Sequence, residues 1–382
     1  MSVLGERSQN LTFAQKLANT NWMLIVLIFA TAGIGLAMLY SVANGNVNPW
    51  MSRQLVRFAI GLAVMFTVAF IDIRVWMRLA YPIYGVALSL LVLVQAMGTI
   101  GMGAQRWVSL GVFNLQPSEL MKIALVLALA RYFHSLSHED VGRVRWLLVP
   151  TAMVLAPAAL VLMEPDLGTA SLLVLGGFAL FFLAGVRWWK FAIAVAALLG
   201  TIPFAWDRLH SYQKARILTF LDPGRDPLGA GYHILQSKIA LGSGGIWGKG
   251  YLLGTQSHLS FLPEKQTDFI FTTLAEEFGL VGGLFLLALY VAMMAYGFAI
   301  GLRVRSQFGR LLAMGVTTTF FLYVFINVAM VMGLIPVVGV PLPLISYGGT
   351  AMVTILTGFG LLLSAYIHRD IQIPKRGGFD PL

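Results

Sequence analysis

The sequence predicts an all-α polytopic membrane protein, with about ten transmembrane helices and one large extracytoplasmic loop between spans seven and eight. Hydrophobic residues make up 58% of the 382 positions, and the mean hydropathy is +0.81. The 26 Lys and Arg and 16 Asp and Glu residues are too few to cover soluble domains of this total length. Apolar runs of roughly 20 residues, the length that crosses a bilayer, recur along the chain. One long segment, 207–268, is instead rich in Gly, polar and charged residues.

Ten apolar stretches are long enough to be spans. The fifth and sixth are separated only by 164–167, which must form a tight turn at a membrane surface. An even number of spans places both termini on the same side. The predicted spans are 22–41, 54–71, 77–97, 118–134, 146–163, 168–186, 188–206, 269–300, 309–336 and 344–368.

Basic residues predict which side the termini occupy, because Lys and Arg in short loops are retained in the cytoplasm. Fifteen lie in the terminal segments and in the loops on the same side as the termini, against only Arg53, Arg57 and Arg106 in the opposite short loops. We therefore expect one membrane domain over 1–382, with cytoplasmic segments 1–21 and 369–382 and the large loop outside. Some twenty polar residues precede a full-length first span, so no cleavable signal peptide is expected.

Composition also excludes several classes of function. The chain has no cysteine, which removes disulfides, thiolate nucleophiles and Cys-ligated metals. The net charge of +10 is spread between apolar runs and does not form the basic face of a nucleic-acid-binding protein. The glycine-rich pieces 242–245 and 248–250 lack the spacing of a phosphate-binding loop, and no strand is predicted before them.

Three acidic residues fall where predicted spans meet the outer surface: Glu119, Asp166 and Asp268. Ionised groups at membrane depth are costly and usually face a polar cavity. Lys122 lies one helical turn after Glu119, which predicts a buried ion pair, and such a pair is either structural or functional. Asp166 and Asp268 are open to two interpretations, as N-caps of the following spans or as reacting groups.

Two further features complete the outer surface. Glu276 and Glu277 are adjacent, hence about 100° apart on a helix, so both cannot face one cavity and we expect one to pair with a neighbouring span. The large loop carries basic residues above the three acids. Carboxylates beneath a cationic loop suit an anionic substrate that also needs a base, such as a lipid-linked phosphate or pyrophosphate. The basic residues of the loop are Arg208, Lys214, Arg216, Arg225, Lys238 and Lys249.

Several long motifs resemble those of the SEDS family (shape, elongation, division, sporulation). The central one runs from Phe261 to Phe271 and is followed by Leu274–Gly279. The resemblance covers nearly the whole chain and is closest to the elongation branch, with the division branch as competitor. The other matching segments are Gln105–Trp107, Gln116–Glu119 with Lys122, Glu164–Thr169, Gly254–Ser257 and Pro341–Gly349.

This resemblance implies a peptidoglycan glycosyltransferase of the bacterial inner membrane. Its substrate would be lipid II, polymerised on the periplasmic side, and its partner would be a class B penicillin-binding protein of the PBP2 type, a transpeptidase that crosslinks the strands. Besides these and membrane lipid, no partner is expected, and nucleic acid is excluded.

The resemblance marks Asp268 as essential, and we assign it as the general base. Glu119, Lys122 and Asp166 are expected to shape the catalytic cavity. No intrinsic cofactor is expected; the leaving pyrophosphate calls for either fixed cations or a divalent ion, Mg²⁺ or Mn²⁺. The residues predicted to bind substrate or pyrophosphate are Lys122, Arg208, Lys214, Arg216, Lys265 and Ser346.

Two other functions stay open from the sequence. A transporter or flippase of lipid II would also hold charged groups in a membrane cavity. It needs groups accessible from both sides, however, whereas the three acids all fall at the outer side. A non-catalytic scaffold would leave that clustering unexplained.

Overall fold

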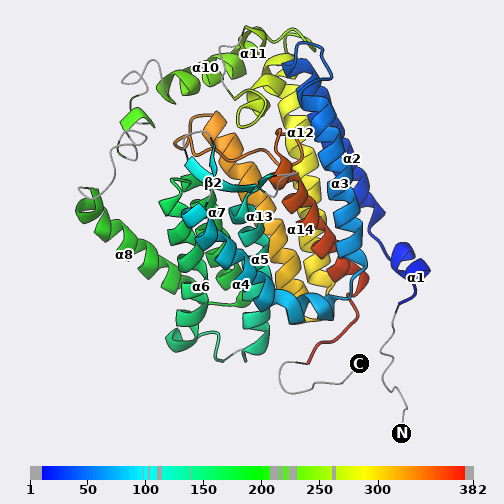
Figure 1. Ribbon diagram of the computed structural model, residues 1–382, viewed down its shortest axis with the longest axis vertical. Helices are drawn as coiled ribbons and strands as arrows, with labels where there is room; N and C mark the ends of the chain where they lie inside the picture. The colour runs from blue at the N-terminus through cyan, green and yellow to red at the C-terminus, as the bar shows by residue number, and fades with distance from the viewer. Residues whose placement is uncertain are drawn as a thin grey trace.

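The computed structural model describes residues 11–97, 99–101, 104–109, 114–137, 139–206, 214, 218–220, 222, 230–259 and 264–374. These residues form a bundle of helices, most of them running along its long axis (Figure 1). The helices α10 and α11 lie at one end, and α1 (Phe13–Ala18) and the C-terminal end of α14 lie toward the other. We call the first of these the Asp268 end.

Each predicted span corresponds to one helix, with bounds that agree to within five residues. The helices are α2 (Trp22–Val42), α3 (Trp50–Phe70), α4 (Ile73–Met97), α5 (Pro117–Ser135), α6 (Val144–Met163), α7 (Leu167–Ala184), α8 (Trp188–Trp206), α12 (Ile270–Arg303), α13 (Gln307–Val331) and α14 (Gly349–Ile367).

Eight helices of the described chain are long and apolar enough to cross a membrane: α2, α3, α4, α6, α7, α12, α13 and α14. The predicted fold class, a mainly helical polytopic membrane protein, is confirmed, while the number of ten spans stays a prediction. The helix α5 carries Glu119, Lys122 and Arg131, yet nearly all of it is buried. It packs against α4, α7 and α13, so protein rather than lipid surrounds Glu119 and Lys122.

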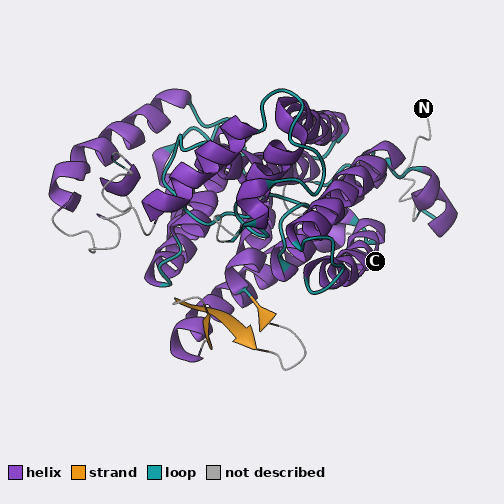
Figure 2. Cartoon of the chain, turned by 90° about the horizontal axis from the view of Figure 1, so that it is seen from above, coloured by secondary structure: helices purple, strands orange, loops and turns teal. Residues whose placement is uncertain are grey.

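A small sheet departs from the all-helical prediction. Strands β1 (Thr99–Gly101), β2 (Ala104–Ser109) and β3 (Asn114–Leu115) form a three-stranded antiparallel sheet between α4 and α5 (Figure 2). Windows that detect spans of about 20 residues cannot detect strands of two to six residues. The sheet matters because β2 carries Arg106 toward the carboxylates described below.

The polar segment 207–268 contains helices that the sequence did not predict, α10 (Ala230–Ser243) and α11 (Thr255–His258). The helix α10 packs against α12 and buries Ile234 and Ala240. The apolar stretch of α10 is too short to be predicted as a membrane span. Contact with α12 stabilises it instead.

The helix α12 is broken near its start. Gly279 has φ 66° and ψ −163°, outside the helical region and readily adopted only by glycine. The break separates the turns that follow Asp268 from a longer apolar part, and the segment after α10 lies against it.

Candidate active site

Asp268 lies in the loop that leads into α12, and this loop is fixed through its backbone. The Ser346 hydroxyl donates to the Thr267 carbonyl over 2.6 Å, and the Asn327 amide donates to the Asp268 carbonyl over 2.9 Å. The backbone N–H of Tyr347 donates to the Gln266 carbonyl over 2.8 Å. Two distant parts of the chain, α13 and the segment before α14, thus hold the loop in one position.

The carboxylate of Asp268 is not a helix cap. The N-cap of α12 is Phe269, and no side chain accepts a hydrogen bond at this helix start. The neighbouring Thr267 does not cap the helix either, since it donates its hydroxyl to Glu264. Within the residues that the structure describes, the backbone of Asp268 is bonded and its carboxylate accepts no hydrogen bond.

The surroundings of Asp268 make its carboxylate unusually basic. Burial raises its pKa to about 6, and the negative charges of Glu264 and Asp166 act in the same direction. Arg106 opposes this shift. These four residues therefore share one electrostatic site. A carboxylate with a pKa near 6 is mostly ionised at neutral pH, yet it accepts a proton more readily than an exposed aspartate.

Arg106 of β2 holds the turn between α6 and α7. Its guanidinium donates to the carbonyls of Glu164 and Pro165 over 3.1 and 2.7 Å, and lies 3.9 Å from the carboxylate of Asp166. Asp166 also accepts hydrogen bonds from the backbone N–H and the hydroxyl of Thr169, both over 3.0 Å. The capping interpretation of Asp166 is therefore confirmed, and the same residue also lies in the electrostatic site.

Glu164 is the least satisfied acid of this site. Its side chain is only 3% exposed, and neither carboxyl oxygen has a hydrogen-bond partner among the residues that the structure describes. Burial raises its pKa to about 8, the charge of Asp166 adds to the shift, and Arg106 opposes it. Glu164 is consequently protonated at neutral pH, so the site holds one neutral acid beside Asp268, which is mostly ionised.

The predicted pair of Glu119 and Lys122 is confirmed. The ammonium donates to Glu119 over 2.6 Å, and both side chains are buried in α5. Tyr323 completes the group: its hydroxyl donates to the second oxygen of Glu119 over 2.7 Å, and its ring lies 4.4 Å below the Lys122 ammonium. Small cavities flank Lys122 on two sides, one bounded by α7 and one by α14.

The other predicted substrate-binding residues are differently placed. Lys265 is buried and donates to the Ser257 carbonyl over 2.5 Å, and burial lowers the pKa of its ammonium. Ser346 holds the Asp268 loop, as described. Lys214 is described, but its neighbours on both sides are not. Arg208 and Arg216 lie outside the described residues.

Sequence reasoning missed three residues of this site. Two of them, Tyr323 and Asn327, lie four and eight residues after Thr319. This spacing places Thr319, Tyr323 and Asn327 on one face of α13. Polar side chains at that spacing within an apolar helix were a signal that could have found them. Arg106 was counted as a marker of topology and as part of the matching segment Gln105–Trp107, but not as a site residue, because no rule of spacing links a residue of β2 to the turn at Asp166.

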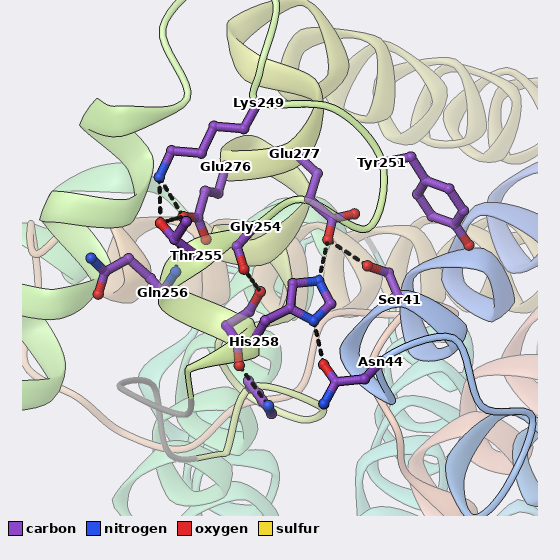
Figure 3. Close-up of polar contacts among 12 residues, drawn as sticks. Ser41, Asn44, Lys249, Tyr251, Gly254, Thr255, Gln256, His258, Glu276 and Glu277 are labelled. Carbon is purple, nitrogen blue, oxygen red and sulfur yellow. Dashed lines mark hydrogen bonds and ion pairs between the residues drawn. The ribbon is translucent and has the colours of Figure 1, made fainter.

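A second acidic group lies beside the first, and we call it the Glu276–Glu277 clamp (Figure 3). Glu276 accepts hydrogen bonds from the Lys249 ammonium over 2.7 Å and from the Thr255 hydroxyl over 3.0 Å. Glu277 accepts one from Ser41 of α2 and lies 3.3 Å from the His258 ring, confirming that one of the two glutamates pairs with a neighbouring span. The clamp consists of Glu276, Glu277, Lys249, Thr255, Gln256, His258, Ser41 and Asn44.

The fold and the site together define the class of this protein. It is a polytopic helical membrane protein with a buried carboxylate site at one end of the bundle. A family model described as cell cycle protein, covering FtsW, RodA and SpoVE, matches residues 18–371. The chain therefore belongs to this family, the SEDS family that its motifs resemble.

Curated relatives carry names from both branches of the family. The peptidoglycan glycosyltransferase MrdB of Escherichia coli K12 is 48% identical over 296 residues, which cover 76% of this chain and 78% of that protein. A probable peptidoglycan glycosyltransferase FtsW of Thioalkalivibrio sulfidiphilus is 42% identical over 290 residues, covering 74% and 70%.

Solved structures agree with the fold. A chain described under "Structural coordination of polymerization and crosslinking by a peptidoglycan synthase complex" superposes with a TM-score of 0.81 at 34% identity, covering 92% of this chain and 98% of that one. The rod shape determining protein RodA of Thermus thermophilus superposes with a TM-score of 0.70 at 30% identity, with the same coverage.

Proposed function

We propose that this chain is a peptidoglycan glycosyltransferase that polymerises lipid II into glycan strands at the outer face of the membrane during cell elongation. The names of the MrdB and FtsW relatives support the class of reaction. The higher identity to MrdB favours elongation over division. The observation that carries the mechanism is the Asp268 carboxylate, which has no partner among the described residues although its loop is fixed on both sides.

Asp268 acts as the general base. The 4-hydroxyl of an acceptor sugar attacks the anomeric carbon of the donor, the bond to undecaprenyl pyrophosphate breaks, and the configuration inverts. The proton of that hydroxyl passes to Asp268 and then to solvent. A base must come within about 3 Å of the proton that it accepts, which is why the fixed loop matters. A pKa near 6 suits this task at neutral pH.

The departing pyrophosphate needs positive charge. Among the described residues, Arg106 is the cation whose charge lowers the pKa of Asp268, and Lys122 is held in an ion pair with Glu119. We assign the pyrophosphate to fixed cations, including Arg208, Lys214 and Arg216 of the large loop, and Mg²⁺ or Mn²⁺ stays a prediction from the sequence.

The working enzyme is proposed to act with a class B penicillin-binding protein. The structural neighbour with the higher TM-score comes from a peptidoglycan synthase complex that coordinates polymerization and crosslinking, which supports such a partner. Both termini are assigned to the cytoplasm from the distribution of basic residues, which puts the Asp268 end outside. Lipid II and the crosslinking partner then meet the chain on the same side.

The decisive test replaces Asp268 by Asn and measures glycan formation from lipid II by purified protein, alone and with the penicillin-binding protein. Asn cannot accept the proton, so activity should fall by about 100-fold or more. The thermal stability should be preserved, because the loop is held through backbone atoms. Wild-type activity should also fall below about pH 6, where Asp268 becomes protonated.

The control is Asp370→Asn, the same change at an exposed residue at the other end of the bundle. Full polymerisation by Asp268→Asn would remove the general base from the proposal. Wild-type protein that forms no glycan with its partner, but moves lipid II across vesicle membranes, would favour the transporter instead.

A further inference from the structure

A loop of the polar segment exposes apolar side chains at the Asp268 end of the bundle. Between α10 and α11, the segment Ile246–Leu253 presents Ile246, Trp247 and Leu253 with 60%, 79% and 62% of their surface exposed. Contiguous exposed apolar side chains are unusual on a surface that faces only water, and they typically mark a site of contact with protein or membrane. We call this segment the interface loop.

The interface loop is rigidly joined to the break in α12. Backbone N–H groups of Lys249 and Gly250 donate to the carbonyls of Glu276 and Glu277, each over 3.0 Å. In the other direction, the N–H of Leu280 donates to Gly245 over 2.9 Å. A Cβ at Gly248 would lie 2.1 Å from the Glu277 carbonyl, so only glycine permits this approach. The position of the loop along α12 is therefore fixed.

The length of α12 indicates the level of the membrane at which the interface loop lies. Its 34 residues are interrupted by the break at Gly279, so each part is compared separately with the roughly 30 Å of the hydrocarbon core. The part after Gly279, residues 280–303, is about 36 Å long and suffices to span it. The break, and the loop paired with it, thus lie close to the membrane surface.

The neighbouring helix α2 gives the same level independently. The Tyr251 hydroxyl donates to the Ala37 carbonyl over 2.8 Å, and Ala37 precedes the end of α2 by five residues, or about 7.5 Å. The Tyr251 side chain therefore reaches below the end of this span. The apolar surface also continues from the loop onto α12, where Leu280 and Leu284 are exposed.

We propose that the interface loop is a membrane anchor, with Ile246, Trp247 and Leu253 inserted at the headgroup–acyl boundary of the leaflet at the Asp268 end. Tryptophan and tyrosine favour this region of a bilayer, where one edge of the ring is wet and the other apolar. The lipid is the occupant because the exposed apolar surface is continuous with that of the spans, which lipid covers.

The anchor also bears on the loop of Asp268. The Lys249 ammonium within the anchor binds Glu276, and the segment continues into α11 with Thr255 and His258 of the clamp. Lys265 then joins α11 to the Asp268 loop through the Ser257 carbonyl. These contacts connect the lipid-inserted loop to the loop of Asp268. Lipid contact therefore fixes the position of the Asp268 carboxylate relative to the membrane surface, where the proposed substrate, itself a lipid, is presented.

The natural absence of cysteine makes a direct test possible. Trp247→Cys and Leu253→Cys carry a nitroxide label in full-length protein reconstituted into phosphatidylcholine vesicles. Accessibility to oxygen and to a water-soluble nickel complex then gives the depth. Leu284→Cys on α12 is the lipid reference, and Asn46→Cys in the exposed α2–α3 connection is the aqueous reference.

We expect both labels to favour oxygen over the nickel complex, at a depth within about 10 Å of the headgroups and between the two references. Nickel accessibility equal to that at Asn46 would overturn the proposal. So would protection from both reagents that appears only when a penicillin-binding protein is added, because protein would then be the occupant. Neither readout depends on polymerisation, so the result is independent of the proposed activity.

A second variant guards against misfolding of the cysteine variants. Trp247→Phe keeps an apolar ring, and the other eight tryptophans stay in place. In vesicles of lipid brominated near the headgroup end of its chains, wild-type protein should lose more fluorescence than the variant. Equal quenching of the two proteins would contradict insertion of Trp247.

Discussion

The two acidic groups at the Asp268 end differ in how their carboxylates are satisfied. In the Glu276–Glu277 clamp, a single oxygen of Glu276 accepts hydrogen bonds from Lys249, Thr255 and the backbone of Gln256. At the neighbouring site, neither Glu164 nor Asp268 accepts a side-chain hydrogen bond within the described part of the chain. Glu164 and Glu276 are both buried, so burial alone does not separate the two groups.

The difference separates a structural role from a chemical one. A buried carboxylate that several donors satisfy is stabilised as an ion and holds elements together. A buried carboxylate without donors is costly as an ion, so its pKa rises and it becomes able to exchange a proton near neutral pH. The clamp fixes the framework, and the site beside it retains the groups that can react.

The largest effect is expected when the clamp loses its cation. Lys249→Met leaves Glu276, whose side chain is fully buried, without its charge partner. The Lys249 side chain is itself 27% exposed, but the carboxylate left behind is fully buried, and an uncompensated buried charge costs about 3 kcal/mol or more of unfolding free energy. The loss should appear as a lower melting temperature of the purified protein in detergent.

The double variant Lys249→Met with Glu276→Gln sharpens this expectation. Removing both charges together should recover a large part of the lost stability, because no uncompensated charge remains. If Lys249→Met alone melts like the wild type, the hydrogen bonds to Thr255 and Gln256 suffice for Glu276, and the ion pair contributes nothing.

A smaller effect is expected at the backbone contact beneath the clamp. Gly248→Ala places a Cβ 2.1 Å from the Glu277 carbonyl at a φ of +81°, and should destabilise the protein by roughly 1–3 kcal/mol. Gly245→Ala is the matched control, since its φ is +56° but no atom lies within 4 Å of the added Cβ. Equal melting temperatures for the two variants would mean that the close approach is relieved by a shift of the loop.

The same contrast explains what the sequence could predict. The spans follow from apolar runs of membrane length, and the pair of Glu119 and Lys122 follows from helical spacing, so both were predictable. The hydrogen bonds of Asn327 to Asp268 and of Ser41 to Glu277 join residues 59 and 236 positions apart. No local pattern encodes such contacts. Whether a buried carboxylate has hydrogen-bond donors depends on such contacts. The sequence could therefore locate the acidic residues but could not predict which of them are structural and which can react.

The most pH-dependent effect is expected at Glu164. Its folded-state pKa is about 8 against an ordinary value of 4.5, so the native state holds a proton that the unfolded state releases. The stability that this protonation contributes is complete below about pH 4.5 and is lost as the pH rises through about 8. Glu164→Gln mimics the protonated form. The variant should therefore melt like the wild type at pH 5 and above it at pH 8.5, whereas Asp370→Asn should show no such divergence. A Glu164→Gln variant that is less stable than the wild type at alkaline pH would mean that Glu164 is ionised and bound by a donor, which would place it with the clamp rather than with Asp268.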